Sequence, residues 1–309
     1  MTPARPLWAR LAVPALLLSV WYGIFAITFL PGASFEHLVW ALPGLVAGLS
    51  VAFVRLDWQL FGPAIVRGPA TGDAVFLTFD DGPDPEYTPR VLDTLAAFGA
   101  KATFFVVGER VEAQPELARR IVEEGHQLGH HGHRHLWLGL LRPKVLWADF
   151  ARGQEAIRAA TGRTPRLHRP PVGLVAPPTV SVCSDWSCEL AAWSRRPRDG
   201  TEMDPEVVIS RVLRGIGPGE IVLLHDAPGP THRGRLPAAV EALPRLLEEL
   251  TRLGLRSATL AELMERDPYL EEEEVARGVT AQARFTWLEP IIWVTFAVLC
   301  LALGFSHPG

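Results

Sequence analysis

Residues 76–85 read FLTFDDGPDP, and this stretch decides the fold that we expect for the middle of the chain. An apolar run of the kind found in buried β-strands ends in two adjacent carboxylates, Asp80 and Asp81. Because side chains alternate between the two faces of a strand, Asp80 and Asp81 should point in different directions. Asp, Gly and Pro are also ordinary turn residues, so an acidic turn is the plain alternative.

Short apolar runs alternate with helical patterns between residues 71 and 268, which indicates βα units around a parallel sheet or barrel. We expect strands at residues 74–79, 102–107, 126–130, 166–168, 189–193, 220–224 and 255–258. Helices are expected at residues 89–98, 115–124, 143–160, 178–187, 205–213 and 237–253. About seven such units suit an α/β barrel slightly short of the eight-stranded form. Residues 269–286 contain the acidic run 271–274 and are expected to form a solvated connector.

Hydrophobic residues make up 48% of the 309 residues, which is high for a soluble protein, and the excess lies at the two ends of the chain. The uncharged run at residues 11–30 is long enough to span a bilayer, and shorter runs follow at 38–54 and 287–306. A second run follows the first at once, which favours retained anchors over a cleaved signal peptide. We therefore predict two membrane helices within residues 1–57 and a third at 287–306, with packed amphipathic helices as the alternative for the two shorter runs.

Arginines near these runs predict an orientation in the cell (inner) membrane. They precede the first run, follow the second and precede the third: Arg5, Arg10, Arg55, Arg67, Arg277 and Arg284. The positive-inside rule then places the central domain on the cytoplasmic side, next to the lipid bilayer. Large domains cross membranes regardless of charge, so an extracytoplasmic domain is the alternative. The net charge of −4 gives no nucleic-acid footprint, and the sequence indicates no protein partner.

Reactive side chains follow the expected strands at five places, where a parallel barrel positions its chemistry. In chain order these are the Asp80–Asp81 pair, His131 with His135, Arg169, Asp199 and His225. A coincidence over five units is harder to attribute to chance than any single motif. The sequence therefore predicts one functional site at this edge of the barrel.

Residues 125–135 read GHQLGHHGHRH and hold five of the ten histidines. His131 and His135 are four residues apart, so on a helical turn they would share one face, as a metal site requires. With Asp81 as a third ligand they would form a two-His, one-Asp site with an open position for water. Asp80 would then be free to act as a general base. A His-rich surface loop is the plain alternative.

Three further pieces are weaker alone: RPPVG at 169–173, a Trp-led loop at 193–199 that ends in Asp199, and LLHD at 223–226. In this order, together with TFDDGP and the histidine pair, they resemble the polysaccharide deacetylase family. This is the NodB homology domain, or carbohydrate esterase family 4, and the resemblance covers residues 74–264. It implies a distorted (β/α)7 TIM-like barrel, flanked in this chain by the expected transmembrane helices.

The resemblance also implies a divalent metal cofactor bound by Asp81, His131 and His135. Zinc is the preferred candidate, and Co²⁺, Ni²⁺ and Mn²⁺ are the alternatives. Asp80 would be the general base and His225 the general acid.

Two side chains would position these groups, because the resemblance implies that Arg169 orients Asp80 and that Asp199 pairs with His225. In the implied substrate pocket, the backbone N–H of Val172 would donate a hydrogen bond to the oxyanion, and Leu223 would line the acetyl pocket. Pro171 and Trp193 are its two other implied residues.

Three positions depart from the family pattern. Gly132 replaces the usual Ser or Thr between the histidines, which removes a hydroxyl that would brace the loop. Val172 replaces a common Tyr, and Gly200 replaces a Trp, which should open one wall of the pocket. We therefore expect an active enzyme with an altered substrate pocket.

The function implied is metal-dependent hydrolysis of an N-acyl group, N-acetyl first, from an amino sugar in a polysaccharide or a lipid-linked glycan. A lipid phosphate could be held by arginines near the mouth, unless they form a solvated basic loop: Arg195, Arg196, Arg198, Arg233 and Arg235. One rival is a catalytically inactive, membrane-anchored glycan-binding module on the same barrel. Another is a metal-dependent phosphoesterase, which a single metal triad without a second carboxylate cluster disfavours.

Overall fold

The computed structural model describes residues 59, 62–136, 143–201, 204–229 and 238–281. Apart from Gln59, these residues belong to one structural unit, Gly62–Arg284. The three predicted membrane helices, at 11–30, 38–54 and 287–306, lie outside the described residues. Within the described ranges, no helix is both long enough and apolar enough to cross a membrane.

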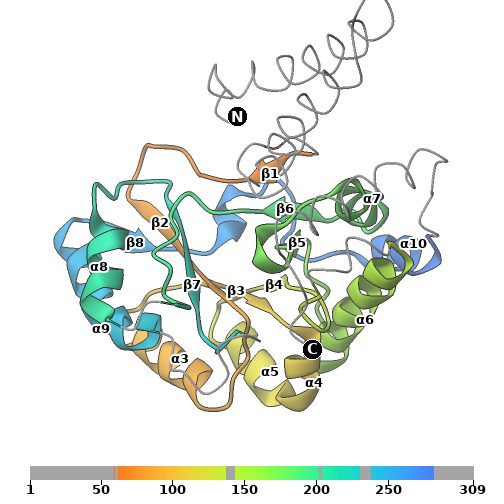
Figure 1. Cartoon of the computed structure of the whole chain (residues 1–309), viewed down its shortest axis with the longest axis horizontal. Helices are drawn as coiled ribbons and strands as arrows, with labels where there is room; N and C mark the ends of the chain where they lie inside the picture. Colours follow the sequence, from red (N-terminus) through yellow and green to blue (C-terminus); the bar gives the residue numbers. More distant parts are fainter. Residues whose placement is uncertain (1–58, 60–61, 137–142, 202–203, 230–237, 282–309) are drawn as a thin grey trace, which may run out of the picture. The chain divides into compact units, whose positions relative to one another are not determined.

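A parallel sheet of eight strands forms the centre of this unit (Figure 1). Strand β2 (Ala74–Asp80) pairs with β3 (Thr103–Val106) on one side and with β7 (Ile221–His225) on the other. Beyond β3 follow β4 (Gln127–His130), β5 (Leu167–His168), β6 (Glu189–Ala191) and β1 (Ala64–Ile65). Strand β8 (Arg256–Ser257) pairs with the start of β2.

The sheet also curves, so that the chain after β6, near one edge, approaches β7 at the other edge. The chain just after β6 forms an isolated parallel bridge to β7, between Arg195 and Val222. This arrangement agrees with the distorted (β/α)7 architecture expected from the sequence.

Strand β2 is buried on both faces, which explains its continuous apolar run. Val75, Leu77 and Phe79 belong to the large core cluster that also contains the buried side chains of the surrounding helices. Phe76 belongs to a separate cluster with residues from β3, β5, β6 and β7. Because side chains alternate along the strand, Thr78 and Asp80 share the face of Phe76. The period of two thus brings a hydroxyl and a carboxylate to the inner face of the sheet.

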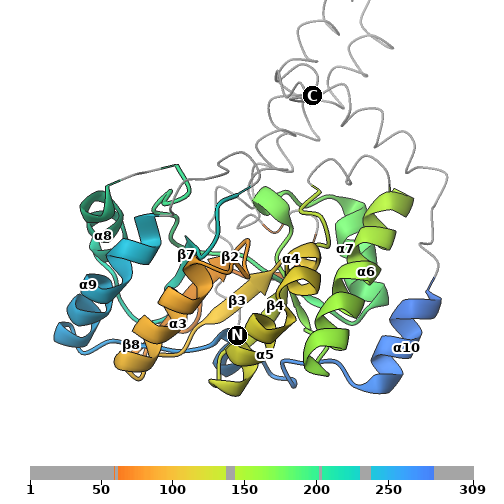
Figure 2. The ribbon, with the colours of Figure 1, turned by 90° about the horizontal axis from the view of Figure 1, so that it is seen from below.

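Helices lie around the outside of the sheet, and Figure 2 shows α9, α3, α5 and α6 one beside the next. The helices are α3 (Tyr87–Ala97), α4 (Gly108–Ala113), α5 (Pro115–Glu123), α6 (Pro143–Thr161), α7 (Pro177–Asp185), α8 (Pro205–Leu213), α9 (Ala238–Arg252) and α10 (Glu272–Thr280). Two 3₁₀ turns are η3 (Pro171–Gly173) and η4 (Leu260–Leu263). Several helices begin on a proline, whose fixed φ and missing N–H suit the first turn.

Every strand and helix that the sequence predicts between residues 71 and 268 is present, with ends shifted by a few residues. The sequence did not predict β1, α4 or α10. The acidic run shows the largest difference, because part of it forms α10 instead of a solvated connector. Glu274 is buried, and its carboxylate accepts hydrogen bonds of 2.9 and 2.7 Å from the Arg166 guanidinium. Helix α10 is therefore attached to the barrel by a buried ion pair.

Candidate active site

A cavity of about 470 Å³ opens at the carboxyl ends of the strands. It brings together eight of the predicted catalytic, metal-binding and pocket residues: Asp80, Asp81, His131, His135, Val172, Trp193, Leu223 and His225. Arg169 and Asp199 do not line the cavity, but each contacts a residue that does.

The carboxylates of Asp80 and Asp81 both face this cavity, so the prediction that they point in different directions is wrong. Asp80 is the last residue of β2, whereas Asp81 has a φ of 77° and has left the strand conformation. The alternation of side chains therefore does not extend to Asp81, and Asp is among the residues that tolerate this backbone region. His131 Nε2 lies 3.8 Å from Asp80 Oδ2 and 3.6 Å from Asp81 Oδ1.

The turn after Asp81 is held by Asp226, a residue for which the sequence predicts no role. Asp226 accepts hydrogen bonds from the Gly82 N–H at 3.2 Å and from the Thr88 hydroxyl at 2.5 Å. A Cβ at Gly82 would collide with this carboxylate, so only glycine fits there. Burial raises the pKa of Asp226 to about 7. The only signal in the sequence is a second acid directly after His225.

Asp81, His131 and His135 form a group whose potential ligand atoms all lie within 4.8 Å of one another. The Nδ1–H of His131 donates to the Arg169 carbonyl oxygen at 2.6 Å, so its Nε2 lone pair is free to face the carboxylates. His135 Nε2 lies 3.2 Å from Asp81 Oδ1. Burial, and then the proximity of the two imidazoles, lowers the pKa of His131, and burial lowers that of His135. Neutral imidazoles with one carboxylate fit a divalent metal, and they fit zinc in particular.

The four-residue spacing of His131 and His135 suggested a helical turn, but the two histidines lie in a loop. No helix includes residues 131–136, and both Gly132 and His135 have positive φ, of 81° and 55°. The loop is braced from α6, because Asp149 accepts the His133 N–H at 2.9 Å and the Arg134 N–H at 3.3 Å. A Cβ at Gly132 would lie 3.2 Å from Asp149 Oδ2. The Asp149 carboxylate thus braces the loop where the sequence lacks a hydroxyl at position 132.

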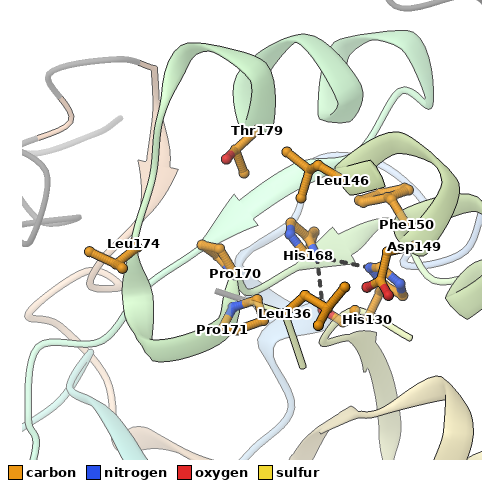
Figure 3. Close-up of a pocket in the computed structure, with 11 residues that line it drawn as sticks. His130, Leu136, Leu146, Asp149, Phe150, His168, Pro170, Pro171, Leu174 and Thr179 are labelled. Carbon is orange, nitrogen blue, oxygen red and sulfur yellow. Dashed lines mark hydrogen bonds between the residues drawn. The ribbon is translucent and has the colours of Figure 1, made fainter. Parts of the chain in front are cut away.

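Pro171 lies apart from the cavity in which the family resemblance placed it. It lines a smaller cavity beneath the histidine loop, together with His130, Asp149 and His168 (Figure 3). The Nδ1 atoms of His130 and His168 lie 2.9 Å apart there, and the Phe150 ring centroid lies 4.4 Å from that of His130. Burial lowers the pKa of both histidines, so they are neutral parts of the packing.

Arg169 is fully buried and fixes the Asp80 carboxylate. Its Nη1 donates to Asp80 Oδ1 at 2.6 Å and to Thr78 Oγ1 at 2.8 Å, while Nη2 donates to the Ala192 carbonyl oxygen at 2.8 Å. The guanidinium carbon lies 4.0 Å from the Phe105 ring centroid. Burial raises the pKa of Asp80 to about 6, even though Arg169 opposes the shift. Thr78 was not predicted, although the strand period places it on the face of Asp80.

His225 is held by Asp199 from behind. Asp199 accepts from His225 twice, from the ring Nδ1–H at 3.0 Å and from the backbone N–H at 2.8 Å. Burial lowers the pKa of His225, but Asp199 and then Asp81 and Asp80 outweigh it and raise the pKa to about 10. The Asp199 carboxylate therefore favours the imidazolium form of His225, which can donate a proton.

The walls of the cavity come from the loops after β5 and β6, from the end of strand β7 and from the loop after it. Val172 is half-exposed and has a φ of 53°, in the left-handed region. Leu223 is buried, and Trp193 lies close to Gly173, where a Cβ would collide with the indole ring. Gly200 also lines the cavity. The cavity thus brings the Asp80 carboxylate, the His225 imidazole and three potential metal ligands together.

Comparisons with known proteins agree with this geometry. The family model described as polysaccharide deacetylase matches residues 67–190. A peptidoglycan-N-acetylglucosamine deacetylase of Bacillus cereus is 35% identical over 68% of this chain and 97% of its own. A chitooligosaccharide deacetylase of a Bradyrhizobium species is 37% identical over 62% of this chain and 90% of its own.

A solved structure shares the fold of the described unit. It is a peptidoglycan N-acetylglucosamine deacetylase in complex with 4-naphthalen-1-yl-N-oxidanyl-benzamide, with 30% identity and a TM-score of 0.60 over 66% of this chain and 93% of its own. The chain therefore belongs to the polysaccharide deacetylase family, hydrolases that cleave carbon–nitrogen bonds.

Proposed function

We propose that this protein removes an N-acyl group from an amino sugar of a glycan and releases a carboxylic acid and a free amine. An N-acetyl group is the preferred candidate. One observation carries the proposal. The buried base Asp80 and the charged acid His225 are register partners on the paired strands β2 and β7. Asp81, His131 and His135 lie beside them around the same cavity. An amide bond held there would meet a proton acceptor and a proton donor together.

The donor set of Asp81, His131 and His135 would hold a divalent cation, with zinc before Co²⁺, Ni²⁺ or Mn²⁺. Bound there, the cation would polarise the acyl carbonyl and make water a competent nucleophile near neutral pH.

The chain's own residues would carry the proton transfers. Asp80, held by Arg169, accepts the proton of the attacking water. The backbone N–H of Val172 would donate to the oxyanion that forms on the acyl oxygen. His225 then gives its Nε2 proton to the sugar nitrogen as the carbon–nitrogen bond breaks, while Asp199 holds Nδ1. The products are the carboxylic acid and the free amine.

The substrate that we propose is a glycan containing N-acetylglucosamine, because the similar deacetylases are named for peptidoglycan and chitooligosaccharide. An N-acyl sugar on a lipid carrier is the alternative. We also propose anchoring by the apolar runs at the two ends, with the barrel on the cytoplasmic side. Accessibility of tags fused to the barrel, measured in intact and in permeabilised cells, tests that orientation.

The central test is the variant Asp80→Asn in the full chain. Turnover of acetylated chitooligosaccharides should fall by about 10²- to 10⁴-fold, the usual contribution of a general base. Metal content, measured by elemental analysis, should stay the same because Asp80 is not among the three ligands. Full activity in this variant would contradict the assignment of Asp80. Absence of amine release by the wild-type protein from any N-acyl sugar would instead favour an inactive glycan-binding module.

A further inference from the structure

Two arginines on the wall of the cavity have no place in the mechanism above. Arg196 and Arg198, in the loop between β6 and α8, line the cavity beside His225 and the metal ligands. We propose that they bind an anionic group, a phosphate or a carboxylate, carried by the N-acylated sugar or by its neighbour in the glycan. This inference rests on the proposed function and narrows its substrate class to anionic glycans.

The loop that carries these arginines is anchored at the residues on either side of Arg196. Arg195 donates to the carbonyl oxygens of Val212, Arg214 and Gly215 at 3.1, 2.8 and 2.7 Å. The carbonyl oxygen of Pro197, in turn, accepts a hydrogen bond of 2.9 Å from Arg211. Arg195, which the sequence had grouped with the mouth of the site, is therefore structural. The loop is fixed to α8 and the turn after it, and Arg196 and Arg198 face the cavity.

Arg198 lies in a strained turn that also supports the acid. Its φ is 65°, in the left-handed region that a side chain other than glycine rarely adopts. Its carbonyl oxygen accepts the Thr201 N–H at 3.0 Å, and the next residue, Asp199, holds His225. The turn that orients the acid therefore also holds Arg198 at the cavity. Backbone strain of this kind is commonly found at functional sites.

The charges of the cavity favour an anion. Two carboxylates, Asp80 and Asp81, would balance a divalent cation. Asp199 offsets His225, and the buried Arg169 adds one positive charge beside Asp80. Arg196 and Arg198 add two more, and neither forms an ion pair with a carboxylate of the described residues. The Arg196 guanidinium lies 5.8 Å from the Trp193 ring centroid, which leaves its N–H donors available. A neutral glycan would give these charges no partner, whereas a phosphate or carboxylate would accept charge-assisted hydrogen bonds.

A matched pair of ligands tests this inference by binding. The pair is N,N′-diacetylchitobiose and its 1-phosphate, titrated by calorimetry into the metal-loaded full chain with Asp80→Asn, the background used for every binding measurement so that the sugars are not turned over. We expect the phosphate form to bind at least tenfold more tightly, as charge-assisted hydrogen bonds predict. Arg196→Gln and Arg198→Gln should each reduce that preference severalfold and leave binding of the neutral sugar unchanged. Arg214→Gln, an exposed arginine outside the cavity wall, is the control for loss of charge.

A second arm separates the sources of the anion. A disaccharide of N-acetylglucosamine and N-acetylmuramic acid presents a carboxylate in place of the phosphate, and tighter binding of either form identifies the source. Equal affinity for charged and neutral sugars would overturn the inference, as would equal losses for both in the two variants. Because affinity is measured without turnover, absence of amine release would contradict the proposed function alone.

Discussion

The carboxylate of Asp149 accepts the backbone N–H of His133 at 2.9 Å, and it thereby fixes the loop that carries both potential histidine ligands. The brace comes from helix α6, and Gly132 leaves room for it. The left-handed φ of Gly132 would be strained for a residue with a Cβ. The loop conformation that Asp149 stabilises therefore depends on a glycine at position 132. Asp149 also accepts from Arg134, so two successive N–H groups of the loop depend on it.

Removal of this brace should weaken metal binding. We expect Asp149→Ala to lower zinc affinity by about 10- to 100-fold, the usual cost of losing a group that orients ligands. Calorimetric titration of the metal-free protein measures the change. Glu155→Ala, an exposed acid on the same helix, should leave affinity unchanged. Unaltered zinc affinity in a folded Asp149→Ala protein would show that the loop keeps its shape without the brace.

The dependence of kcat/KM on pH should have two limbs. The proposed mechanism requires ionised Asp80 and protonated His225, whose pKa values are raised to about 6 and about 10. A bound cation can only lower both pKa values, so the acid limb should lie at or below about 6 and the alkaline limb at or below about 10. Activity should therefore rise through the first pKa and fall through the second.

Asp199→Asn assigns the alkaline limb. Loss of the negative charge beside His225 lowers the pKa of the imidazolium, so the alkaline limb should move to lower pH. The Asn oxygen can accept only one of the two hydrogen bonds that Asp199 accepts from His225. If it accepts the backbone N–H, its NH2 group faces the ring Nδ1, which disfavours the imidazolium further. Asp93→Asn, at an exposed position of α3, is the control. An alkaline limb unmoved by Asp199→Asn would assign that limb to another group.

Much of the fold was predictable from the sequence because its signals are local. Strands buried on both faces read as apolar runs, and a proline in the first turn indicates where several helices begin. Strand β1 has two residues and α4 has six, too few to show a period. Helix α10 was missed because its charged sequence looks solvated, although Glu274 is buried against Arg166.

The site was predictable in its residues but not in its geometry. Asp80, Asp81, His131, His135 and His225 meet at one cavity, as the strand ends suggested. The positive φ of Asp81 is set by its turn, so no strand rule could give the direction of its side chain. The roles of Asp149 and Asp226 depend on contacts with distant segments, and no spacing rule indicates them.

Arg169 should matter for stability as well as for activity. Arg169→Met leaves the buried Asp80 carboxylate without its partner, so the free energy of unfolding should fall by about 3–5 kcal/mol. The pKa of Asp80 should rise further, which moves the acid limb to higher pH. Urea denaturation measures the first effect. The double variant with Asp80→Asn should recover part of the loss, because no buried charge then remains. Additive losses would mean that the pair is not coupled.

The ion pair between Arg166 and Glu274 should stabilise the protein in a pH-dependent way. Glu274→Ala leaves the buried Arg166 unpaired, so the free energy of unfolding near neutral pH should fall by about 3–5 kcal/mol. Glu273→Ala, at an exposed position of the same helix, should change it by less than about 0.5 kcal/mol.

The pH dependence identifies the ion pair as the cause. Hydrogen bonding to Arg166 lowers the pKa of Glu274 from 4.5 to about 2, so its contribution is complete above the ordinary value and is lost as the pH falls through the lower one. Urea denaturation of wild type and Glu274→Ala should therefore show a stability difference that shrinks as the pH falls from about 5 to about 2. A difference that stays constant over this range would assign the loss to packing of α10.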